Sequence, residues 1–338
     1  MKILVTGGAG FIGINSAKRF LDEGHEVIIF DNLSRDGTEK NLEWFKEQGE
    51  FIFIKGDVRD FEQVKGCFLE HRDIDVVLHL AAQVAVTTSV TDPRVDFEVN
   101  ALGTFNVCEA VRGFQPRSIL LNASTNKVYG EMKDLEIVEK DGRYNYKDLS
   151  QGIPETRPLD FHSPYGCSKG AADQYVMDYS RIYNLRTVNF RQSCIYGSHQ
   201  FGVEDQGWVA WFAICAVLGR PVTVYGDGKQ MRDILHIDDL VDCYFRAIRD
   251  IDKASGQVYN TGGGTENTLS LLELISMLER ILGKKLEYGF DDWRPGDQKT
   301  FICDIRKARD SFGWKPRVDV KEGVERLVKW VSENRDIF

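Results

Sequence analysis

The sequence predicts an α/β protein built on a doubly wound parallel sheet, with a smaller second domain toward the C-terminus. Three observations predict this fold. Through the first half of the 338 residues, short β-branched runs alternate with longer amphipathic stretches. A glycine-rich turn follows the first run, and in the second half Gly- and Pro-rich turns between helices replace the alternation. Strands and helices in regular alternation are typical of parallel strands joined by right-handed crossovers, with helices on both faces of the sheet.

The individual elements are predicted in chain order from their residue pattern. Runs of strand length lie at 2–6, 26–31, 51–57, 75–80, 117–123 and 185–191. Helices are expected between them, at 12–23, 61–71, 93–112 and 164–183. Val258-Tyr259-Asn260 is a candidate for one more strand of the same sheet. A later helix is expected to begin at a capping box, Ser270 to Glu273, and to stop at Gly283.

The composition excludes several classes of protein. The 43 basic and 52 acidic side chains sum to a net charge of −9, so no basic surface for nucleic acid is expected. The longest apolar run, Trp208 to Leu218, has 11 residues and is too short to span a membrane. Seven scattered cysteines without a Cys-x-x-Cys pair, and six histidines without ligand spacing, predict neither a disulfide framework nor a metal site. Because the first strand starts at Lys2, we expect a reduced, cytoplasmic protein without a signal peptide.

A dinucleotide site is predicted between the first strand and the first helix. The run Gly7-Gly-Ala-Gly10-Phe11-Ile12-Gly13 has the spacing of a Rossmann-type fingerprint, whose glycines allow a tight turn and close approach of the backbone to a pyrophosphate. Asp31 ends the second strand 18 residues after Gly13. A carboxylate there accepts the ribose hydroxyls and repels a 2′-phosphate, so NAD is favoured over NADP. The nearby Arg35 keeps NADP open as an alternative.

Residues at the ends of two other strands are expected to face the same ligand, because ligands of parallel sheets bind at the carboxyl ends of the strands. Asp57 and Val58 close the third strand, and we expect them near the adenine. Leu80, Ala81 and Ala82 close the fourth strand, and we expect them on the pyrophosphate side.

The domain boundaries are predicted from the alternation of strands and helices in the first half and its loss in the second half. Residues 1–190 are predicted to form the NAD-binding domain, which also receives about 234–262. Residues 191–338 are predicted to form mainly the domain that binds the second ligand. Glu131–Asp160, rich in charged and turn residues, is expected to be a surface insertion that acts as a lid or as an assembly surface.

Three Tyr-x-x-x-Lys pairs in the sequence are candidates for a catalytic tyrosine and its lysine. The three are Tyr129/Lys133, Tyr165/Lys169 and Tyr225/Lys229. Only the second follows a helix start, Ser163-Pro164, which places both of its side chains on one helix face. The other two lie in glycine turns, where a helix is not expected. Thr125, at the end of the fifth strand, is expected to hold the reacting hydroxyl beside this pair.

A tyrosine acts as a base only when its pKa is lowered. Moving the pKa of Tyr165 from about 10 to near 7 takes roughly 4 kcal/mol. One cation at ~4 Å supplies about that much at an effective dielectric near 20. Lys169 and an oxidised nicotinamide are the two candidate cations, and the predicted catalytic set is Thr125, Tyr165 and Lys169.

These motifs together resemble the extended short-chain dehydrogenase/reductase family of nucleotide-sugar epimerases and dehydratases. The resemblance covers nearly the whole chain and rests on 7–13, 57–58, 79–83, 128–130, 165–169, 232–233 and 294–297. It implies that Thr125 is the catalytic Ser/Thr and that Asp31 is the acid on the NAD ribose. It also implies cofactor contacts from Asn32, Ser34, Arg35, Gln83 and Asn100. The expected substrate contacts, besides Thr125, are Asn126, Arg232, Arg294 and Asp297.

Three segments, at 124–130, 161–175 and 205–208, are similar to family members that interconvert CDP-activated 3,6-dideoxyhexoses at C2. This resemblance implies a nucleotide-diphosphate sugar, with a CDP-hexose favoured, as the small-molecule partner. Asn126 and Lys127 stand where the 4,6-dehydratases carry Asp-Glu, so elimination of water lacks its acid and base. Cys194 replaces an asparagine that often touches substrate phosphate, which weakens the interpretation as a UDP-galactose 4-epimerase.

The long helices at 93–112 and 164–183 suggest a homo-oligomer, a dimer or a tetramer.

Two alternatives stay open. The first is another enzyme of the same fold, such as a C4 epimerase of a UDP-sugar or a net dehydrogenase. The second is a non-catalytic sensor that binds NAD on a dehydrogenase fold. The residues themselves do not distinguish C2 from C4, or cytidine from uridine; only the resemblance does.

Overall fold

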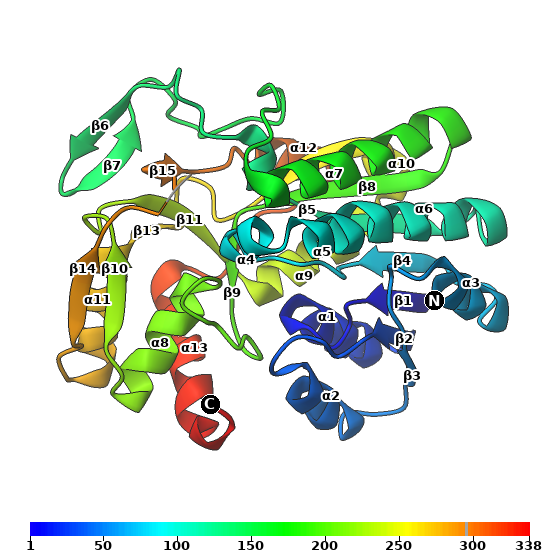
Figure 1. Ribbon diagram of the computed structural model, residues 1–338, viewed down its shortest axis with the longest axis horizontal. Helices are drawn as coiled ribbons and strands as arrows, with labels where there is room; N and C mark the ends of the chain where they lie inside the picture. Colours follow the sequence, from blue (N-terminus) through cyan, green and yellow to red (C-terminus); the bar gives the residue numbers. More distant parts are fainter. Residues whose placement is uncertain (295–296) are drawn as a thin grey trace.

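The computed structural model describes residues 1–294 and 297–338, and a seven-stranded parallel sheet forms its centre (Figure 1). The strand order is β3-β2-β1-β4-β5-β8-β12. The strands are β1 (Lys2–Thr6), β2 (Glu26–Asp31), β3 (Ile52–Lys55), β4 (Val76–His79), β5 (Ile119–Thr125), β8 (Arg186–Gln192) and β12 (Gln257–Thr261). The candidate strand at 258–260 is β12, where Tyr259 pairs with Phe190 of β8. The predicted Rossmann-type α/β fold is therefore confirmed.

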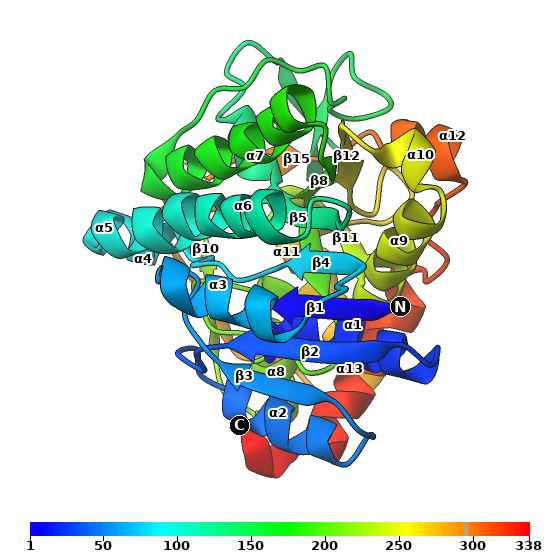
Figure 2. The same ribbon diagram turned by 90° about the vertical axis from the view of Figure 1, so that its right-hand side faces the viewer.

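Helices cover both faces of the sheet (Figure 2). One face carries α3 (Phe61–Glu70), α6 (Gly103–Phe114) and α7 (Ser163–Tyr183), and the other carries α1 (Phe11–Asp22), α2 (Thr38–Lys46) and α9 (Ile237–Arg249). Successive strand side chains point to opposite faces. In β1, Ile3 and Val5 therefore pack with α1 and α9, whereas Leu4 packs with α3 and α6. Both faces are apolar, so the strands read as continuous hydrophobic runs.

The single helix expected over 93–112 has an irregular middle. The chain forms α4 (Val86–Thr91), α5 (Pro93–Phe97), a π-helical turn (Glu98–Leu102) and α6. The carboxylate of Asp92 caps α5 by accepting from the backbone N–H of Val95 at 3.1 Å. The wider turn carries Asn100, whose side chain is 1% exposed. Helical periodicity does not reveal such a turn, because one inserted residue changes little in the apolar pattern.

A second lobe follows, with its own apolar core. Its elements are β9 (Cys194–Tyr196), α8 (Trp208–Leu218), β10 (Val222–Tyr225), β11 (Met231–His236), β13 (Thr268–Ser270), α11 (Leu271–Leu282), β14 (Tyr288–Asp291), β15 (Thr300–Phe301) and α13 (Val320–Glu333). The apolar run at 208–218 is α8, packed against α11 and α13. The predicted capping box at Ser270 is present, and Gly283 ends α11 at φ +64°. Two short helices, α10 (Ile251–Ala254) and α12 (Arg306–Phe312), lie near β12.

The segment at 131–160 is docked on the second lobe. It contains the hairpin of β6 (Ile137–Lys140) and β7 (Arg143–Tyr146), at the upper left of Figure 1. The Tyr144 hydroxyl donates to Asp227 at 2.6 Å, and the Tyr146 hydroxyl donates to the carbonyl of Thr300 at 3.0 Å. The segment is therefore an insertion with fixed contacts to the second lobe. Over residues 1–294 and 297–338, none of the helices combines the length and apolarity that crossing a membrane requires.

Candidate active site

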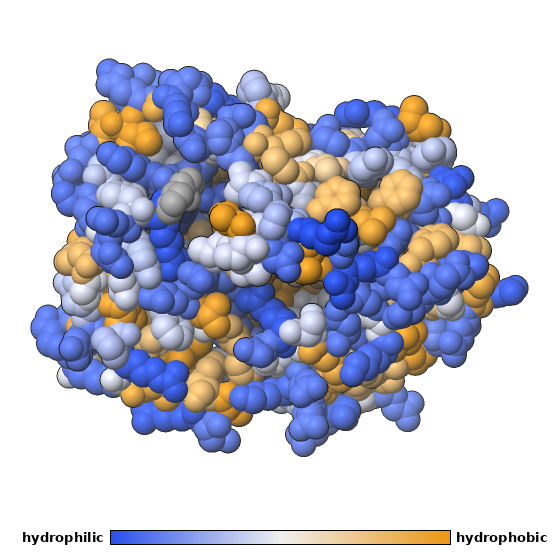
Figure 3. Space-filling view, viewed as in Figure 1, coloured by the Kyte–Doolittle hydropathy of each residue, from blue (hydrophilic) through white to orange (hydrophobic). Residues whose placement is uncertain are grey.

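A cavity of about 590 Å³ opens at the carboxyl edge of the sheet, within the range of small-molecule sites. The molecular surface is hollowed between the sheet and the second lobe (Figure 3). Most of the predicted cofactor residues line this cavity: Gly7, Gly10, Phe11, Ile12, Gly13, Asp31, Asn32, Ser34, Arg35, Asp57, Val58, Leu80, Ala81, Ala82, Gln83, Tyr165 and Lys169. The tertiary structure thus gathers residues from separate segments of the chain around one space.

The β1–α1 turn lacks room for side chains. Gly7 has a φ of +67°, and a Cβ there would lie 2.6 Å from the backbone nitrogen of Ala81. A Cβ on Gly13 would lie 2.3 Å from the carbonyl oxygen of Gly7. Among the described residues, no side chain caps the start of α1 at Gly10. The free N–H groups of this helix end therefore face the cavity, which suits an anion such as a pyrophosphate.

Asp31 lies at the end of β2 and is 8% exposed. Its carboxylate accepts from the backbone N–H groups of Ala9 at 3.0 Å and Leu33 at 2.8 Å. Burial raises the pKa of Asp31, while these two hydrogen bonds lower it. A carboxylate held by two backbone donors keeps lone pairs for further donors, which is what two ribose hydroxyls require.

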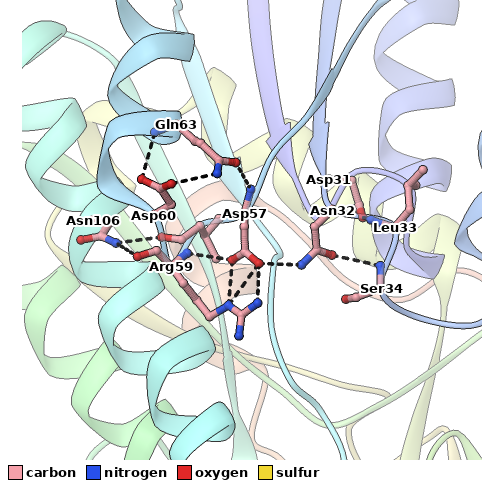
Figure 4. A network of polar contacts seen from close by, with 10 residues as sticks. Asp31, Asn32, Leu33, Ser34, Asp57, Arg59, Asp60, Gln63 and Asn106 are labelled. Carbon is pink, nitrogen blue, oxygen red and sulfur yellow. Dashed lines mark hydrogen bonds and ion pairs between the residues drawn. The ribbon is translucent and has the colours of Figure 1, made fainter.

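Asp57 is already bound by neighbouring side chains (Figure 4). Arg59 donates to its carboxylate at 2.7 Å, and Asn32 donates to it at 3.0 Å. The hydrogen bonds from Arg59 lower the pKa of Asp57 to about 2. Asp57 thus ties the end of β3 to the loop after β2, and Val58 beside it offers an apolar contact to the cavity.

The three predicted catalytic residues meet at the carboxyl end of β5. Tyr165, on the first turn of α7, is 8% exposed and shares a hydrogen bond with the hydroxyl of Thr125. Lys169 follows one turn later, and its Nζ donates to the carbonyl of Ala123 at 2.6 Å. The helix begins at Ser163, one residue before the predicted start, with His162 at the N-cap position. The Ser163 hydroxyl accepts from the backbone N–H of Gly166 at 3.2 Å.

The pKa of Tyr165 is raised in this structure, whereas the proposed role as a base requires a lowered pKa. Burial raises its pKa to about 12, the Thr125 hydrogen bond lowers it, and the charge of Asp96 raises it. Burial lowers the pKa of Lys169 to about 8, opposed by Asp173 and Asp96. The ammonium of Lys169 is directed at the carbonyl of Ala123, and both candidate cations, Lys169 and an oxidised nicotinamide, stay predictions.

Asn100 lies behind the cavity wall and does not line it. Its Oδ1 accepts from the backbone N–H of Gln83 at 2.9 Å, and its Nδ2 donates to the carbonyl of Gln83 at 3.0 Å. The side chain therefore holds the loop after β4, and the direct cofactor contact expected for it is absent from the described cavity lining.

The five expected substrate residues are not among the described residues that line this cavity. They are Thr125, Asn126, Arg232, Arg294 and Asp297. Arg232 is paired with Asp297 at 2.7 Å. Arg294 pairs with Asp205 at 3.0 Å and stacks on the ring of Tyr225, 3.8 Å from its centroid. The Pro-Gly pair between Arg294 and Asp297 lies outside the described residues.

One wall of the cavity was not anticipated from the sequence. A loop of the second lobe contributes five lining residues: His199, Gln200, Phe201, Val203 and Gln206. The guanidinium of Arg35 donates to the side-chain oxygen of Gln206, and Asn41 donates to the carbonyl of His199 at 3.2 Å. These contacts join segments far apart in the chain, so a local pattern carries no signal of them.

Known proteins share this arrangement. The model of the GDP-mannose 4,6-dehydratase family matches residues 4–327. The chain is 44% identical to CDP-paratose 2-epimerase of Salmonella typhi over 337 residues, covering 98% of this chain and 99% of the relative. Among solved structures, Pal from Bacillus thuringiensis has a TM-score of 0.86 and 32% identity, covering 99% of this chain and 100% of that one.

The UDP-glucose 4-epimerase of Thermus thermophilus, solved in complex with NAD, has a TM-score of 0.81 and 33% identity, with 98% of each chain covered. The match of the family model extends over most of the described sheet and second lobe. The chain therefore belongs to the GDP-mannose 4,6-dehydratase family, which includes nucleotide-sugar epimerases and has the features of extended short-chain dehydrogenases/reductases.

Proposed function

We propose that this chain is an NAD-dependent nucleotide-sugar epimerase that inverts C2 of a CDP-hexose: CDP-paratose/CDP-tyvelose or CDP-glucose. The observation that carries the proposal is the buried phenol of Tyr165, hydrogen-bonded to Thr125 and facing the same cavity as the glycine turn. The preference for C2 and for CDP is supported by 44% identity over nearly the full length to the Salmonella typhi CDP-paratose 2-epimerase.

The cavity fits NAD as the cofactor. The glycine turn leaves the space that a pyrophosphate needs, and Asp31, which lines the cavity, is proposed to bind the adenosine ribose through its carboxylate. Arg35, which would favour a 2′-phosphate, instead donates to Gln206. These contacts favour NAD over NADP. When bound, NAD supplies the hydride acceptor and donor of the reaction.

The chain's own residues then handle the proton and the position of the sugar. The ionised oxygen of Tyr165 accepts the proton of the C2 hydroxyl as the C2–H bond breaks and its electron pair leaves as hydride. The hydroxyl of Thr125 orients the reacting oxygen. The 2-keto sugar that would result turns its other face, and Tyr165 gives the proton back to the oxygen on C2, so the configuration at C2 is inverted.

The substrate's diphosphate must stay anchored while the sugar turns. Arg232 and Arg294 are the proposed anchors, because a guanidinium donates two parallel hydrogen bonds to phosphoryl oxygens. Asp297, paired with Arg232, is proposed to hold the nucleotide ribose, and Asn126, which accepts from Thr125 at 3.3 Å, to contact the sugar. The second-lobe loop over the cavity is proposed to retain NAD through the cycle.

The chain is also proposed to form a homo-oligomer, a dimer or a tetramer. Exposed apolar side chains gather on α6 and α7, where Figure 3 shows orange at the upper right. On α7, Tyr175, Ile182 and Tyr183 are 46%, 65% and 47% exposed. Pairing of two copies through these helices buries them. Light scattering of the purified protein tests the assembly state.

NMR of the product tests the reaction. CDP-paratose or CDP-glucose is incubated with the purified protein in deuterated water. Inversion at C2 without deuterium uptake supports the hydride route, and deuterium at C2 would contradict it. Inversion of UDP-glucose at C4 alone identifies a C4 epimerase, and retained NAD without turnover of either sugar identifies a sensor.

A further inference from the structure

The loop at 198–206, which joins β9 to α8, is held in place by contacts with the first two helices. It contributes five of the residues that line the cavity, and in Figure 1 it lies beside α1 and α2. His199 in this loop has a φ of +64°, a conformation that residues other than glycine keep only where their surroundings hold them in it. Its ring lies 3.9 Å from the ring of Trp44 on α2, measured between centroids. The contacts of the loop must therefore fix its backbone.

Two asparagine side chains bind this loop through its backbone carbonyls. The Nδ2 of Asn15, on α1, donates to the carbonyl of Ser198 at 2.9 Å. The Nδ2 of Asn41, on α2, donates to the carbonyl of His199 at 3.2 Å. Because both bonds end on backbone oxygens, they fix the path of the loop itself rather than one of its side chains.

Each of these amides also binds the segment that carries the glycine turn. The Nδ2 of Asn15 donates to the carbonyl of Phe11 at 2.8 Å, and the Nδ2 of Asn41 donates to the carbonyl of Ala9 at 3.1 Å. An amide nitrogen carries two hydrogens, so each asparagine uses one on the loop and one on this segment. The two amides thus tie the loop at 198–206 to the glycine turn.

The rest of the loop is held as closely. A Cβ on Gly37, at the start of α2, would lie 2.3 Å from the ring of Phe201, so this ring packs directly against the backbone there. The guanidinium of Arg35 donates to the side-chain oxygen of Gln206, at the other end of the loop. The loop is therefore joined to the segment around α1 and α2 at its start, its middle and its end.

These contacts bear on how a bound dinucleotide leaves. The glycine turn and the loop line the same cavity, so NAD bound at the turn would be bordered by the loop as well. Release past the loop requires the loop to lift, and lifting breaks the bonds from both asparagines. One amide–carbonyl hydrogen bond changes such an opening equilibrium by roughly 2- to 12-fold.

We propose that Asn15 and Asn41 are positioning residues that latch the loop at 198–206 over bound NAD and so set the rate at which NAD dissociates. The proposal rests on the proposed function only for the role of this loop in retaining NAD between the two hydride transfers. It applies equally to an epimerase that acts on another sugar, because every such cycle returns the hydride from the same cofactor molecule.

The test is the dissociation rate of NAD. Protein loaded with ¹⁴C-labelled NAD is diluted into an excess of unlabelled NAD, and the label that stays on the protein is followed over time. Asn15→Ala and Asn41→Ala are each expected to raise the rate roughly fivefold, and the double variant is expected to raise it further. Asn267→Ala is the matched control, because this amide donates to the carbonyl of Val318 at 3.3 Å within the second lobe. It should release NAD at the native rate.

Hydrogen exchange read by mass spectrometry separates a latch from a distorted cofactor turn. With NAD bound, the backbone amides of 198–206 should exchange faster in Asn15→Ala and Asn41→Ala than in the native chain, while those of 7–13 keep their native protection. If an alanine variant does not fold, Asn15→Asp and Asn41→Asp keep the size of the side chain and remove its donors, and the same results are expected.

Three results would overturn the proposal. They are a native dissociation rate in the folded variants, an equal increase in Asn267→Ala, and faster exchange at 7–13 alone. The measurements use NAD and no sugar, so a failed latch and a failed C2 inversion are told apart.

Discussion

The ionisation of Tyr165 needs more than one cation. With its pKa raised to about 12 by burial, the phenol lies about 5 units above pH 7, and ionising it there costs roughly 7 kcal/mol. One positive charge at ~4 Å supplies about 4 kcal/mol at an effective dielectric near 20. Lys169 alone therefore cannot ionise Tyr165, and the positive charge of the oxidised nicotinamide must supply the rest.

The perturbation is the redox state of the bound cofactor. Reduction to NADH removes one positive charge next to the phenol, so the pKa of Tyr165 should rise by roughly 3 units, about 4 kcal/mol divided by 1.36. The measurement is NMR titration of tyrosine labelled at ¹³Cζ, with Tyr165 assigned by Tyr165→Phe. The same variant should keep NAD and lose kcat by about 10²- to 10⁴-fold. Tyr183→Phe, at an exposed position of the same helix, is the matched control and should retain native turnover.

Two results would refute this reasoning. If Tyr165 titrates at the same pH with NAD⁺ and with NADH, the cofactor charge does not act on it. If Tyr165→Phe epimerises at the native rate, the base is another group. The two readouts are independent, because the titration does not require the sugar to be identified.

Three further predictions concern the cofactor turn, a buried histidine and the substrate anchor. Gly13→Ala should weaken NAD binding by about 1–3 kcal/mol, since its Cβ would lie 2.3 Å from a backbone oxygen; Gly66→Ala, where the structure leaves open space, is the control, and both are read by calorimetry. His79 is neutral in the folded chain, with its pKa lowered from 6.5 to about 3, so its contribution to stability is full above pH 6.5 and is lost as the pH falls toward 3. Between pH 6.5 and about 4.5, the free energy of unfolding should fall by about 2 kcal/mol through His79. Urea unfolding of His79→Gln at the two pH values should not show this decrease. Arg294→Ala should raise KM at least about tenfold with kcat nearly unchanged, because the guanidinium is proposed to anchor the diphosphate and not the reacting sugar. The variant should fold, because the surface pair of Arg294 with Asp205 contributes only about 0–1 kcal/mol to stability.

Each of these predictions has an outcome that contradicts it. Equal NAD affinity in Gly13→Ala and Gly66→Ala would show that NAD binding does not need the close approach of Gly13 to the carbonyl oxygen of Gly7. A native pH dependence of unfolding in His79→Gln would assign the acid sensitivity to other groups. A loss of kcat with an unchanged KM in Arg294→Ala would place that guanidinium at the reacting sugar, away from the diphosphate.

The sequence alone determined the sheet, the glycine turn and the tyrosine–lysine helix. These features are local: alternating strands and helices, three glycines at fixed spacing and a Ser-Pro cap are each visible within a short stretch of chain. Tyr165 and Lys169, predicted from this pattern, line the cavity, and Thr125 ends β5, as the sequence predicts; the catalytic roles of the three stay predictions. Parallel strands bring their carboxyl ends to one edge whatever the details of packing.

Only the tertiary structure decided the electrostatics and the closure of the site. The raised pKa of Tyr165, the buried carboxylate of Asp96 and the pairing of Arg232 with Asp297 depend on which distant groups share one low-dielectric space. The loop at 199–206 reaches the cavity only because the second lobe folds back onto α2. Desolvation and Coulomb energies depend on three-dimensional distance, and residue spacing along the chain does not encode it.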